Sequence, residues 1–479
     1  MKLAVLAALA AAIAAPAPAR AQSAGSTQGL QDTGCVGSDG ASGALFATKA
    51  EVKYAKLFSI AYHDTYKVLS DKAANGTYVL YQCGSQRPSV AGASAYIPVP
   101  VKSVAAWSTS AAAFIEALGV QDRVQNLGTS PSITSACLQQ LLATVIKPFD
   151  EGNATSVDEQ ERNTTVVFNM PGGDEGNTDN TVLSSEYLET SALGRSEWIK
   201  YFAAFFNAEE RANSLFDSIS ANYNCFADKA DSKYNQLRPV VAWTSYAAPS
   251  SFNNNTAYWQ ISNAGFKYDL VRDAGARMLN ASAGGPAAMF TSSAAFLAAL
   301  TKADIVIDES FVSYTYDDLL KNYGVASGDA KKYPWAAAGR VYRPDGIQST
   351  AGGLDWFEAP VVYADALLQD VIAVAHPGFA KGNYSPIWFR DLSESEPVVV
   401  VGASNCTDMY AARRDPAATC SAIDFQNADP AHPDYSGVSA SQTGDVVHDV
   451  SRSGAASRAA ALQAAGSAAI AILAAVCLI

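Results

Sequence analysis

Histidines and the few acidic residues that could work with them are the first candidates for chemistry. The sequence has only four histidines: His63, His376, His432 and His448. A three-histidine site for zinc or manganese is therefore disfavoured, and a hydrolase triad would need one of the four as its base. His63 closely follows a strand-like stretch and His376 ends a helical one, which favours structural roles. As general acids or bases, the sequence offers only three weak candidates: His63, Glu186 and Glu309.

Motifs for cofactors and covalent catalysis are absent from the sequence. It contains no G-x-G-x-x-G, P-loop, H-E-x-x-H, EF-hand loop or G-x-S-x-G elbow. The 33 basic and 46 acidic residues give a net charge of −13, which argues against a nucleic-acid binder. We therefore expect no metal, no cofactor and no nucleic-acid partner.

Cysteine usage indicates an oxidising compartment. Cys477 lies in the last few residues, and six cysteines remain: Cys35, Cys83, Cys137, Cys225, Cys406 and Cys420. An even number in a secreted chain predicts up to three disulfides, with fifteen possible pairings. Cys406 with Cys420 is the preferred single pair, because it closes a loop within a polar segment. The other four are left without assigned partners.

The N-terminus carries a secretory signal. Lys2 precedes an apolar run, Leu3 to Ala15, and Ala19-Arg20-Ala21 offers a cleavage site before Gln22. The run is shorter than the roughly 20 apolar residues that a membrane anchor needs. We therefore expect residues 1–21 to be a signal peptide.

The C-terminus resembles a glycosylphosphatidylinositol (GPI) attachment signal. Small residues at 453–455, a spacer and an uncharged tail from Ser467 to Ile479 follow that pattern. We place the attachment at Ser453, with residues 454–479 removed; the alternative is an Ala-rich helix packed on the body. Without its two ends the chain keeps 30 basic residues (Lys2, Arg20 and Arg458 are lost) against 46 acidic ones.

Glycosylation sequons agree with a eukaryotic secretory route and the outer face of the plasma membrane or the cell wall. The seven N-x-S/T sequons begin at Asn75, Asn153, Asn163, Asn254, Asn280, Asn383 and Asn405.

Hydrophobic periodicity predicts an α/β body. Short strands alternate with helices on both sides of one long helical stretch, Arg195 to Lys229. The expected divisions are a loose lead (22–51), an N-terminal lobe (52–194), a hinge helix (195–230), a C-terminal lobe (231–391) and an acidic tail or stalk (392–453). A second long helix is expected from Trp356 to Ala375.

Several segments resemble the iron-siderophore and vitamin B12 class of periplasmic substrate-binding proteins. They are FSIAYHDTYKVLS (58–70), TYVLYQCG (77–84), VPVKSVAAWSTSAAAFIEALG (99–119), SSEYLETSALGRSEWIKYFAAFFNAEERA (184–212), YDLVRDAGARML (268–279) and the RVYRPDG and DWFEAPVVYADALLQDVIAVAHP stretches within 340–377. The likeness covers about residues 52–391. It implies the class III fold: two Rossmann-like lobes joined by one long hinge helix, with the ligand in the cleft between them.

Loops at the carboxyl ends of parallel strands would line such a cleft. For Trp107 and Trp243, the alternative to lining the cleft is a position in the core of a lobe. For Arg195, the alternative is to cap a helix or to form an ion pair. The candidate ligand-binding residues are Trp107, Ser108, Thr109, Glu186, Tyr187, Arg195, Trp243, Tyr246, Tyr258, Glu309 and Trp356.

The sequence therefore predicts a non-catalytic, monomeric, cell-surface solute-binding protein that contacts the membrane only through its lipid anchor. The resemblance suggests an iron chelate, a corrinoid or a similar small ligand. Two alternatives stay open: a chelatase-like enzyme on the same scaffold, and a structural or adhesion protein with a degenerate cleft. An enzyme needs a convergent acid–base group in the cleft, whereas a structural protein would have its cleft filled.

Overall fold

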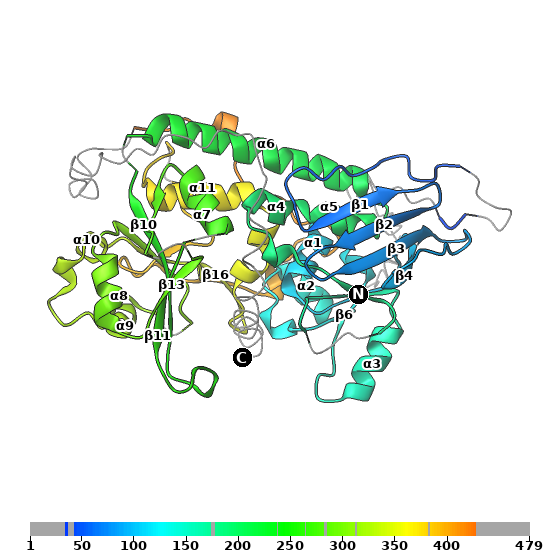
Figure 1. Cartoon of the computed structure of the whole chain (residues 1–479), viewed down its shortest axis with the longest axis horizontal. Helices are drawn as coiled ribbons and strands as arrows, with labels where there is room; N and C mark the ends of the chain where they lie inside the picture. The colour runs from blue at the N-terminus through cyan, green and yellow to red at the C-terminus, as the bar shows by residue number, and fades with distance from the viewer. Residues whose placement is uncertain are drawn as a thin grey trace, which may run out of the picture.

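The computed structural model describes residues 34–36, 43–173, 178–236, 238–263, 265–281, 285–311, 314–381 and 384–427. Within them the chain forms two α/β lobes that lie side by side, with a long helix running along both (Figure 1). The expected signal peptide and GPI tail lie outside these residues. Across the described ranges, no helix combines the length and the apolar character that crossing a membrane requires.

A five-stranded parallel sheet forms the centre of the first lobe, in the order β7-β6-β5-β8-β9. Strands β5 and β8 are buried at every residue, as parallel strands covered on both faces require. The expected parallel α/β arrangement is confirmed. The strands are β5 (Val104–Ala106), β6 (Val124–Leu127), β7 (Lys147–Pro148), β8 (Val166–Asn169) and β9 (Thr181–Leu183), and the helices are α1 (Thr109–Ala117), α2 (Ala136–Leu142) and α3 (Ala154–Arg162).

A second sheet of the first lobe has the order β1-β2-β3-β4. Its strands are β1 (Phe58–Tyr62), β2 (Tyr66–Asp71), β3 (Gly76–Gln82) and β4 (Ala95–Val99). The sequence pattern does not reveal strand β2, because two of its inward-facing residues, Lys67 and Asp71, are polar and break the expected alternation of apolar and polar residues. The buried Lys67 ammonium donates to Ala204 O at 2.7 Å and pairs with Glu209, which ties this sheet to the helices that follow.

The expected loose lead is wrong for residues 43–51, which pack against the first lobe. Phe46 and Ala50 are buried. Just beyond them, the Glu197 carboxylate accepts the backbone N–H groups of residues 53, 54 and 55, and Glu189 accepts those of residues 56 and 57. Side-chain carboxylates thus fix the course of an otherwise irregular segment.

Three helices replace the single hinge helix expected over 195–230. They are α4 (Ala192–Glu197), α5 (Ile199–Ala204) and α6 (Glu209–Tyr234). The chain turns before α6 at Asn207, whose φ is 53°. From Glu209 onward α6 is continuous, and its buried residues recur at helical spacing.

The second lobe is built on a mixed sheet in which β13, β11, β10, β14, β15 and β17 follow one another. Strands β10, β12, β14 and β15 are parallel to one another, β11 pairs antiparallel with both β10 and β13, and β17 pairs antiparallel with β15. The strands are β10 (Val240–Ala247), β11 (Tyr258–Ser262), β12 (Arg277–Met278), β13 (Ala287–Phe290), β14 (Ile305–Asp308), β15 (Val341–Arg343) and β17 (Arg390–Asp391), and the helices are α7 (Phe266–Asp273), α8 (Ser293–Leu300), α9 (Tyr316–Tyr323) and α10 (Pro334–Ala337).

The helix expected from Trp356 to Ala375 begins only at residue 364, as α11 (Ala364–Ala375). Two single-turn segments precede it, over residues 355–357 and 359–361, and Pro360 is the middle residue of the second. Since proline lacks the N–H that a helix interior needs, this stretch stays irregular and forms a loop between the lobes.

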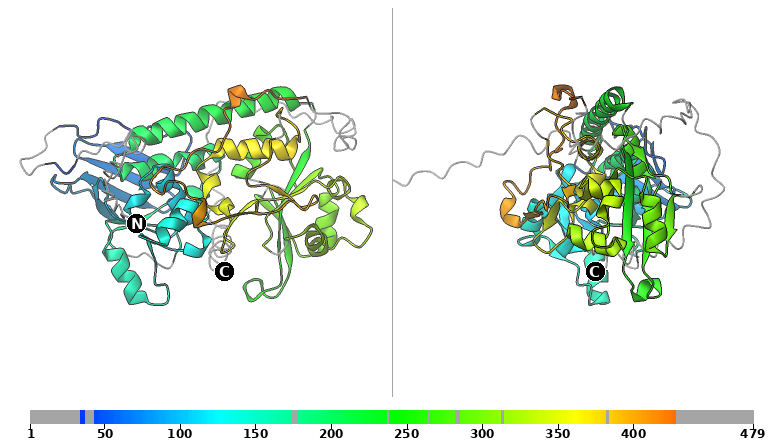
Figure 2. Two further views of the ribbon diagram at one scale, coloured as in Figure 1. Left: turned by 180° about the vertical axis from the view of Figure 1, so that it is seen from behind. Right: turned by 90° about the vertical axis from the view of Figure 1, so that its left-hand side faces the viewer.

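The polar segment after residue 391 is not a free stalk within the described part of the chain. Strand β18 (Val399–Val401) pairs with β16 (Ile347–Ser349) in the second lobe. Residues 399–426, here called the strap, then run back over both lobes, as the orange segment in Figure 2 shows.

The predicted Cys406–Cys420 disulfide is wrong. Cys406 pairs with Cys137, Cys420 pairs with Cys225, and Cys35 pairs with Cys83. Cys406 and Cys420 lie at opposite parts of an extended strap, so each meets a different helix. All four cysteines left without assigned partners are therefore bonded.

His376 ends α11 in the buried core that both lobes share. Its ring stacks on Tyr234 at 3.7 Å between centroids, and burial lowers its pKa to about 3. Unfolding lets it bind a proton near its ordinary pKa of 6.5. Its contribution to stability is therefore complete above pH 6.5 and is lost as pH falls towards 3.

We predict that His376→Phe, which keeps a stacked ring, flattens the acid side of the stability profile. Between pH 6.5 and 4.5 the parent chain should lose about 2.3 kcal/mol more than the variant, because the unfolded state goes from half to nearly full protonation of this histidine while the folded state stays neutral. Urea unfolding at both pH values measures this. The exposed-histidine control His63→Phe should keep the parent slope; an equally steep slope in His376→Phe would contradict the assignment.

Candidate functional site

Charged and aromatic side chains from both lobes come together where the two lobes meet, next to α4. This interlobe site consists of Glu186, Arg195, Trp243, Lys267, Glu309 and Trp356. Glu309 directly follows β14, and Trp243 lies in β10. Arg195 comes from α4 and Lys267 from α7. The position beside the carboxyl ends of parallel strands is where open α/β sheets place ligands.

Arg195 is the site's unsatisfied cation. Its Nε is buried and has no hydrogen-bond partner. The guanidinium lies over the Phe266 ring at 4.0 Å and interacts electrostatically with Glu186 and Glu309. Burial lowers the pKa of Arg195 to about 10, so it remains a cation at neutral pH. A buried guanidinium without a hydrogen-bonded partner is costly and suits an anionic ligand.

The polar residues that flank Arg195 in the sequence already make structural contacts, so they do not bind its guanidinium. Ser191 caps α4 by accepting the Gly194 N–H. Glu189 and Glu197 hold the backbone of residues 53–57, and Glu197 also pairs with Lys200 at 2.8 Å. The E-x-S-x-L-G-R-x-E-W stretch is therefore mostly structural, with Arg195 as its exception.

Glu186 brings a carboxyl group to the same region. It is fully buried, and the Ser110 hydroxyl donates to its Oε1. Its Oε2 has no partner. Burial raises the pKa of Glu186. Protonation would leave Arg195 with less compensation and increase the site's preference for an anion.

Lys267 and Glu309 form an ion pair on the second-lobe side. The Lys267 ammonium lies 5.3 Å from the centre of the Trp243 ring. Trp243 packs on Trp356 with 6.0 Å between ring centroids, and its buried Nε1 donates to no acceptor. The site thus holds two unused donors, from Arg195 and Trp243, and one unused acceptor, from Glu186.

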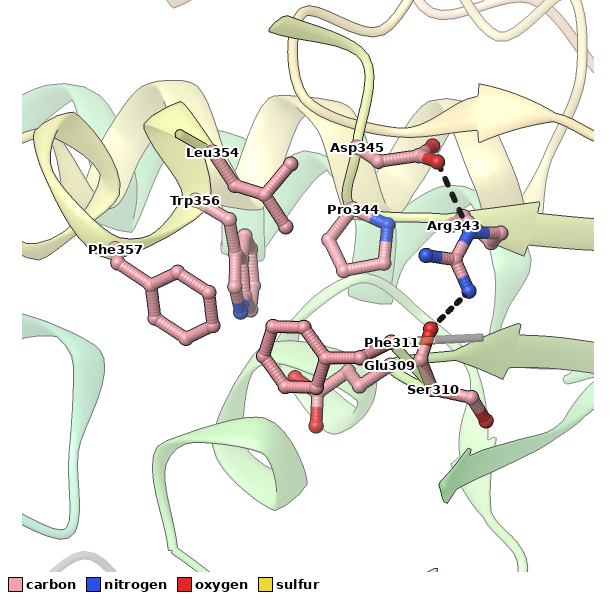
Figure 3. Close-up of a pocket in the computed structure, with 9 residues that line it drawn as sticks. All are labelled: Glu309, Ser310, Phe311, Arg343, Pro344, Asp345, Leu354, Trp356 and Phe357. Carbon is pink, nitrogen blue, oxygen red and sulfur yellow. Dashed lines mark hydrogen bonds and ion pairs between the residues drawn. The ribbon is translucent and has the colours of Figure 1, made fainter. Parts of the chain in front are cut away.

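A shallow hollow opens beside Glu309 and Trp356; its free space of about 240 Å³ includes open solvent, and its enclosed volume is about 10 Å³, room for about one water molecule. Figure 3 shows the rings of Phe311, Trp356 and Phe357 on one side and the Arg343–Asp345 pair on the other. Phe311 and Phe357 are partly exposed and lie nearly parallel, 6.0 Å apart. This volume is below the roughly 300–1,000 Å³ of typical small-molecule pockets.

Buried ion pairs hold the strand ends that line this hollow. The Arg343 guanidinium bonds Asp308 at 2.8 Å and Asp345 at 3.0 Å, and Arg390 bonds Asp345 at 2.7 Å. These pairs fix the loops after β14 and β15 in one arrangement.

The structure brings together five of the predicted site residues: Glu186, Arg195, Trp243, Glu309 and Trp356. Thr109 lies at the lobe boundary, where its hydroxyl donates to Phe357 O at 2.8 Å. Ser108 is the N-cap of α1.

Four other candidates lie away from this group. Trp107 is in the first-lobe core, stacked on Phe149 at 3.9 Å, and donates from Nε1 to Glu161. Tyr187 donates to Pro171 O. Tyr246 and Tyr258 lie on the hairpin of β10 and β11, where Tyr246 packs against Trp259.

Sequence reasoning missed Ser110, Lys267, Phe311, Arg343 and Phe357. Arg343 ends β15, so the strand-end rule that found Glu309 could also have found it. Lys267 is one residue into a helix and carries no such signal. Within the described ranges, no group of three His, Cys, Asp or Glu residues could hold a metal ion.

No protein-family model matches the chain. An uncharacterized lipoprotein of Methanocaldococcus jannaschii is 40% identical over 62 residues, which is 13% of this chain and 14% of that protein. A second uncharacterized protein of that organism is 32% identical over 63 residues, 13% of this chain and 19% of that protein. The chain thus matches less than a fifth of the length of these curated relatives.

Similar solved structures are periplasmic solute-binding proteins. A heme-binding protein from Pseudomonas aeruginosa has 16% identity and a TM-score of 0.43, over 61% of this chain and 98% of that one. FhuD2 from Staphylococcus aureus with bound ferrioxamine B has 12% identity and a TM-score of 0.40, over 57% of this chain and 99% of that one. Likenesses this low assign no ligand to this chain.

Arg195→Met tests whether this arginine serves binding or folding. Replacing a half-buried cation whose Nε has no hydrogen-bonded partner by an apolar side chain of similar length should raise the free energy of unfolding by about 1 kcal/mol. Glu197→Gln, which weakens the clasp on residues 53–55, should lower it by about 3 kcal/mol. Chemical denaturation measures both, and a less stable Arg195→Met would show that the arginine is structural.

Proposed function

We propose that the chain is a solute-binding protein that holds, without covalent chemistry, a small ligand whose anionic or other acceptor oxygen meets Arg195 at the interlobe site. The observation that carries this proposal is the buried Nε of Arg195, which has no hydrogen-bonded partner among the residues that the structure describes. Natural proteins keep such a cation where its partner arrives from outside, because an unpaired buried charge otherwise destabilises the fold.

The neighbouring side chains support the same proposal. Trp356, Phe311 and Phe357 offer an apolar wall, and the Trp243 Nε1–H adds a second free donor. Ligand sites commonly combine such a wall with a few directed polar groups. Of the three acid–base candidates, Glu186 and Glu309 belong to the interlobe site, where Glu309 is paired with Lys267, whereas His63 stacks on Tyr66 in the hairpin of β1 and β2.

The ligand class that we propose is an iron chelate with carboxylate or hydroxamate oxygens, or a corrinoid. A protein similar in structure, FhuD2, holds ferrioxamine B. A chelate of that size exceeds the hollow of about 240 Å³, so its binding would require the lobes to move apart.

Native mass spectrometry of the secreted, oxidised protein tests the proposal. The probes are iron(III) citrate, a ferric hydroxamate siderophore, cobalamin and heme. At least one should be retained, and Arg195→Met should weaken it by about 10–100-fold, the worth of one charge-assisted hydrogen bond.

Arg162→Met is the matched control, because Arg162 is exposed and forms a surface ion pair with Asp158 on α3. It should bind like the parent protein. If no probe is retained, or if Arg195→Met binds as well as the control, the proposed site is wrong.

The proposed location is the outer face of the cell, with a GPI anchor at Ser453 and N-linked glycans. The described sequon asparagines Asn75, Asn153, Asn163, Asn254, Asn280 and Asn405 are all exposed, which leaves them accessible to glycosylation. Asn383 and Ser453 lie outside the described residues.

We expect protein expressed on eukaryotic cells to be released by a phosphatidylinositol-specific phospholipase C and to lose mass with a peptide N-glycosidase. Ser453→Trp, which removes the small residue needed at the attachment site, should abolish surface anchoring. Surface protein that resists the phospholipase would contradict the anchor, and an unchanged mass would contradict the glycans.

A further inference from the structure

The strap is joined covalently to both parts of the molecule. It starts in the second lobe, where β18 pairs with β16. It then reaches α2 of the first lobe through Cys137–Cys406 and returns to α6 through Cys225–Cys420. The Cys137–Cys406 bond therefore links the first lobe to a segment whose preceding strand belongs to the second.

Arg413, midway along the strap, lies among carboxylates from both lobes. Glu116 comes from α1 of the first lobe, and Asp355 and Glu358 come from the second-lobe loop before α11. The Arg413 guanidinium lies 3.0 Å from Asp355, 3.4 Å from Glu358 and 3.9 Å from Glu116. Without it, three buried carboxyl groups would face one another without a cation.

The same loop bonds the first lobe directly. Glu358 accepts the backbone N–H groups of Thr134 and Ser135 at 2.7 and 2.8 Å, and Thr134 Oγ1 donates to Asp355. A Cβ added to Gly353 would lie only 2.4 Å from Ser132 O, so the two lobes touch backbone to backbone here. The strap covers the boundary at which any separation of the lobes would begin.

We propose that the strap is a brace that holds the lobes together, and that the Cys137–Cys406 disulfide is its release point. Both cysteines are partly exposed, whereas in the second anchor only Cys225 is partly exposed and Cys420 is buried. A thiolate can therefore reach Cys137–Cys406 more readily than Cys225–Cys420.

The reductant that the release requires is a dithiol. One of its thiolates attacks a sulfur of the disulfide and displaces the other cysteine as a thiolate. Its second thiol then displaces the protein sulfur from the mixed disulfide. Two electrons pass from the dithiol to the protein, which leaves Cys137 and Cys406 as thiols and the dithiol as a disulfide.

Interlobe distance in the ligand-free protein tests the brace independently of the proposed function. Donor and acceptor dyes are placed on keto amino acids that replace the exposed Lys102 of the first lobe and Lys302 of the second. In the oxidised parent chain the distance distribution should be narrow. In Cys137→Ser/Cys406→Ser it should become longer and broader.

Cys35→Ser/Cys83→Ser is the matched control, since that disulfide joins two segments of the first lobe. It should keep the parent distribution. Mild dithiothreitol treatment of the parent chain, with mass mapping of the reduced bond, gives the same comparison without a mutation. An unchanged narrow distribution after loss of Cys137–Cys406, by either route, would overturn the proposal.

Discussion

The carboxylate of Glu358 is the contact on which the arrangement of the lobes depends. It accepts two backbone N–H groups at the start of α2 while its own chain belongs to the second lobe. Burial and the neighbouring Asp355 raise the pKa of Glu358, and Arg413 opposes that shift. One side chain thus joins the first lobe, the second lobe and the strap.

This constraint decides how the interlobe site can work. The main hydrophobic core runs without interruption from the first lobe through α5, α6 and α11 into the second. On the side of α5, α6 and α11, therefore, the two lobes share one hydrophobic core. On the side of Glu358 and the strap, the lobes are held by hydrogen bonds, ion pairs and a disulfide, which can be broken one at a time. Movement on that side would enlarge the hollow while the core keeps Arg195 in place.

Sequence reasoning succeeded where a local pattern has one physical solution. The predicted alternation of short strands and helices on both sides of a long helical stretch agrees with the two lobes flanking α6. The rule that ligands sit at strand ends nominated Glu309 and the family resemblance nominated Arg195; both lie at the interlobe site, and their role in binding stays a prediction.

It failed where distant contacts override the local pattern. Lys67 faces inward because its ammonium donates hydrogen bonds to Glu209 and Asn207, which lie far away in the sequence. Trp107 follows a strand as a cleft residue would, yet Phe149 and Glu161 draw it into the core. The disulfides could not be paired because no sequence spacing reveals that an acidic, polar tail crosses both lobes. Composition alone made that segment look like a stalk.

Anomalous scattering at the iron edge, from crystals of the oxidised protein grown with iron(III) citrate, tests the central claim most directly. The account predicts one iron peak between the lobes, with a chelate oxygen within hydrogen-bonding distance of the Arg195 guanidinium. A peak elsewhere on the molecule, with Arg195 still unpartnered, would contradict it.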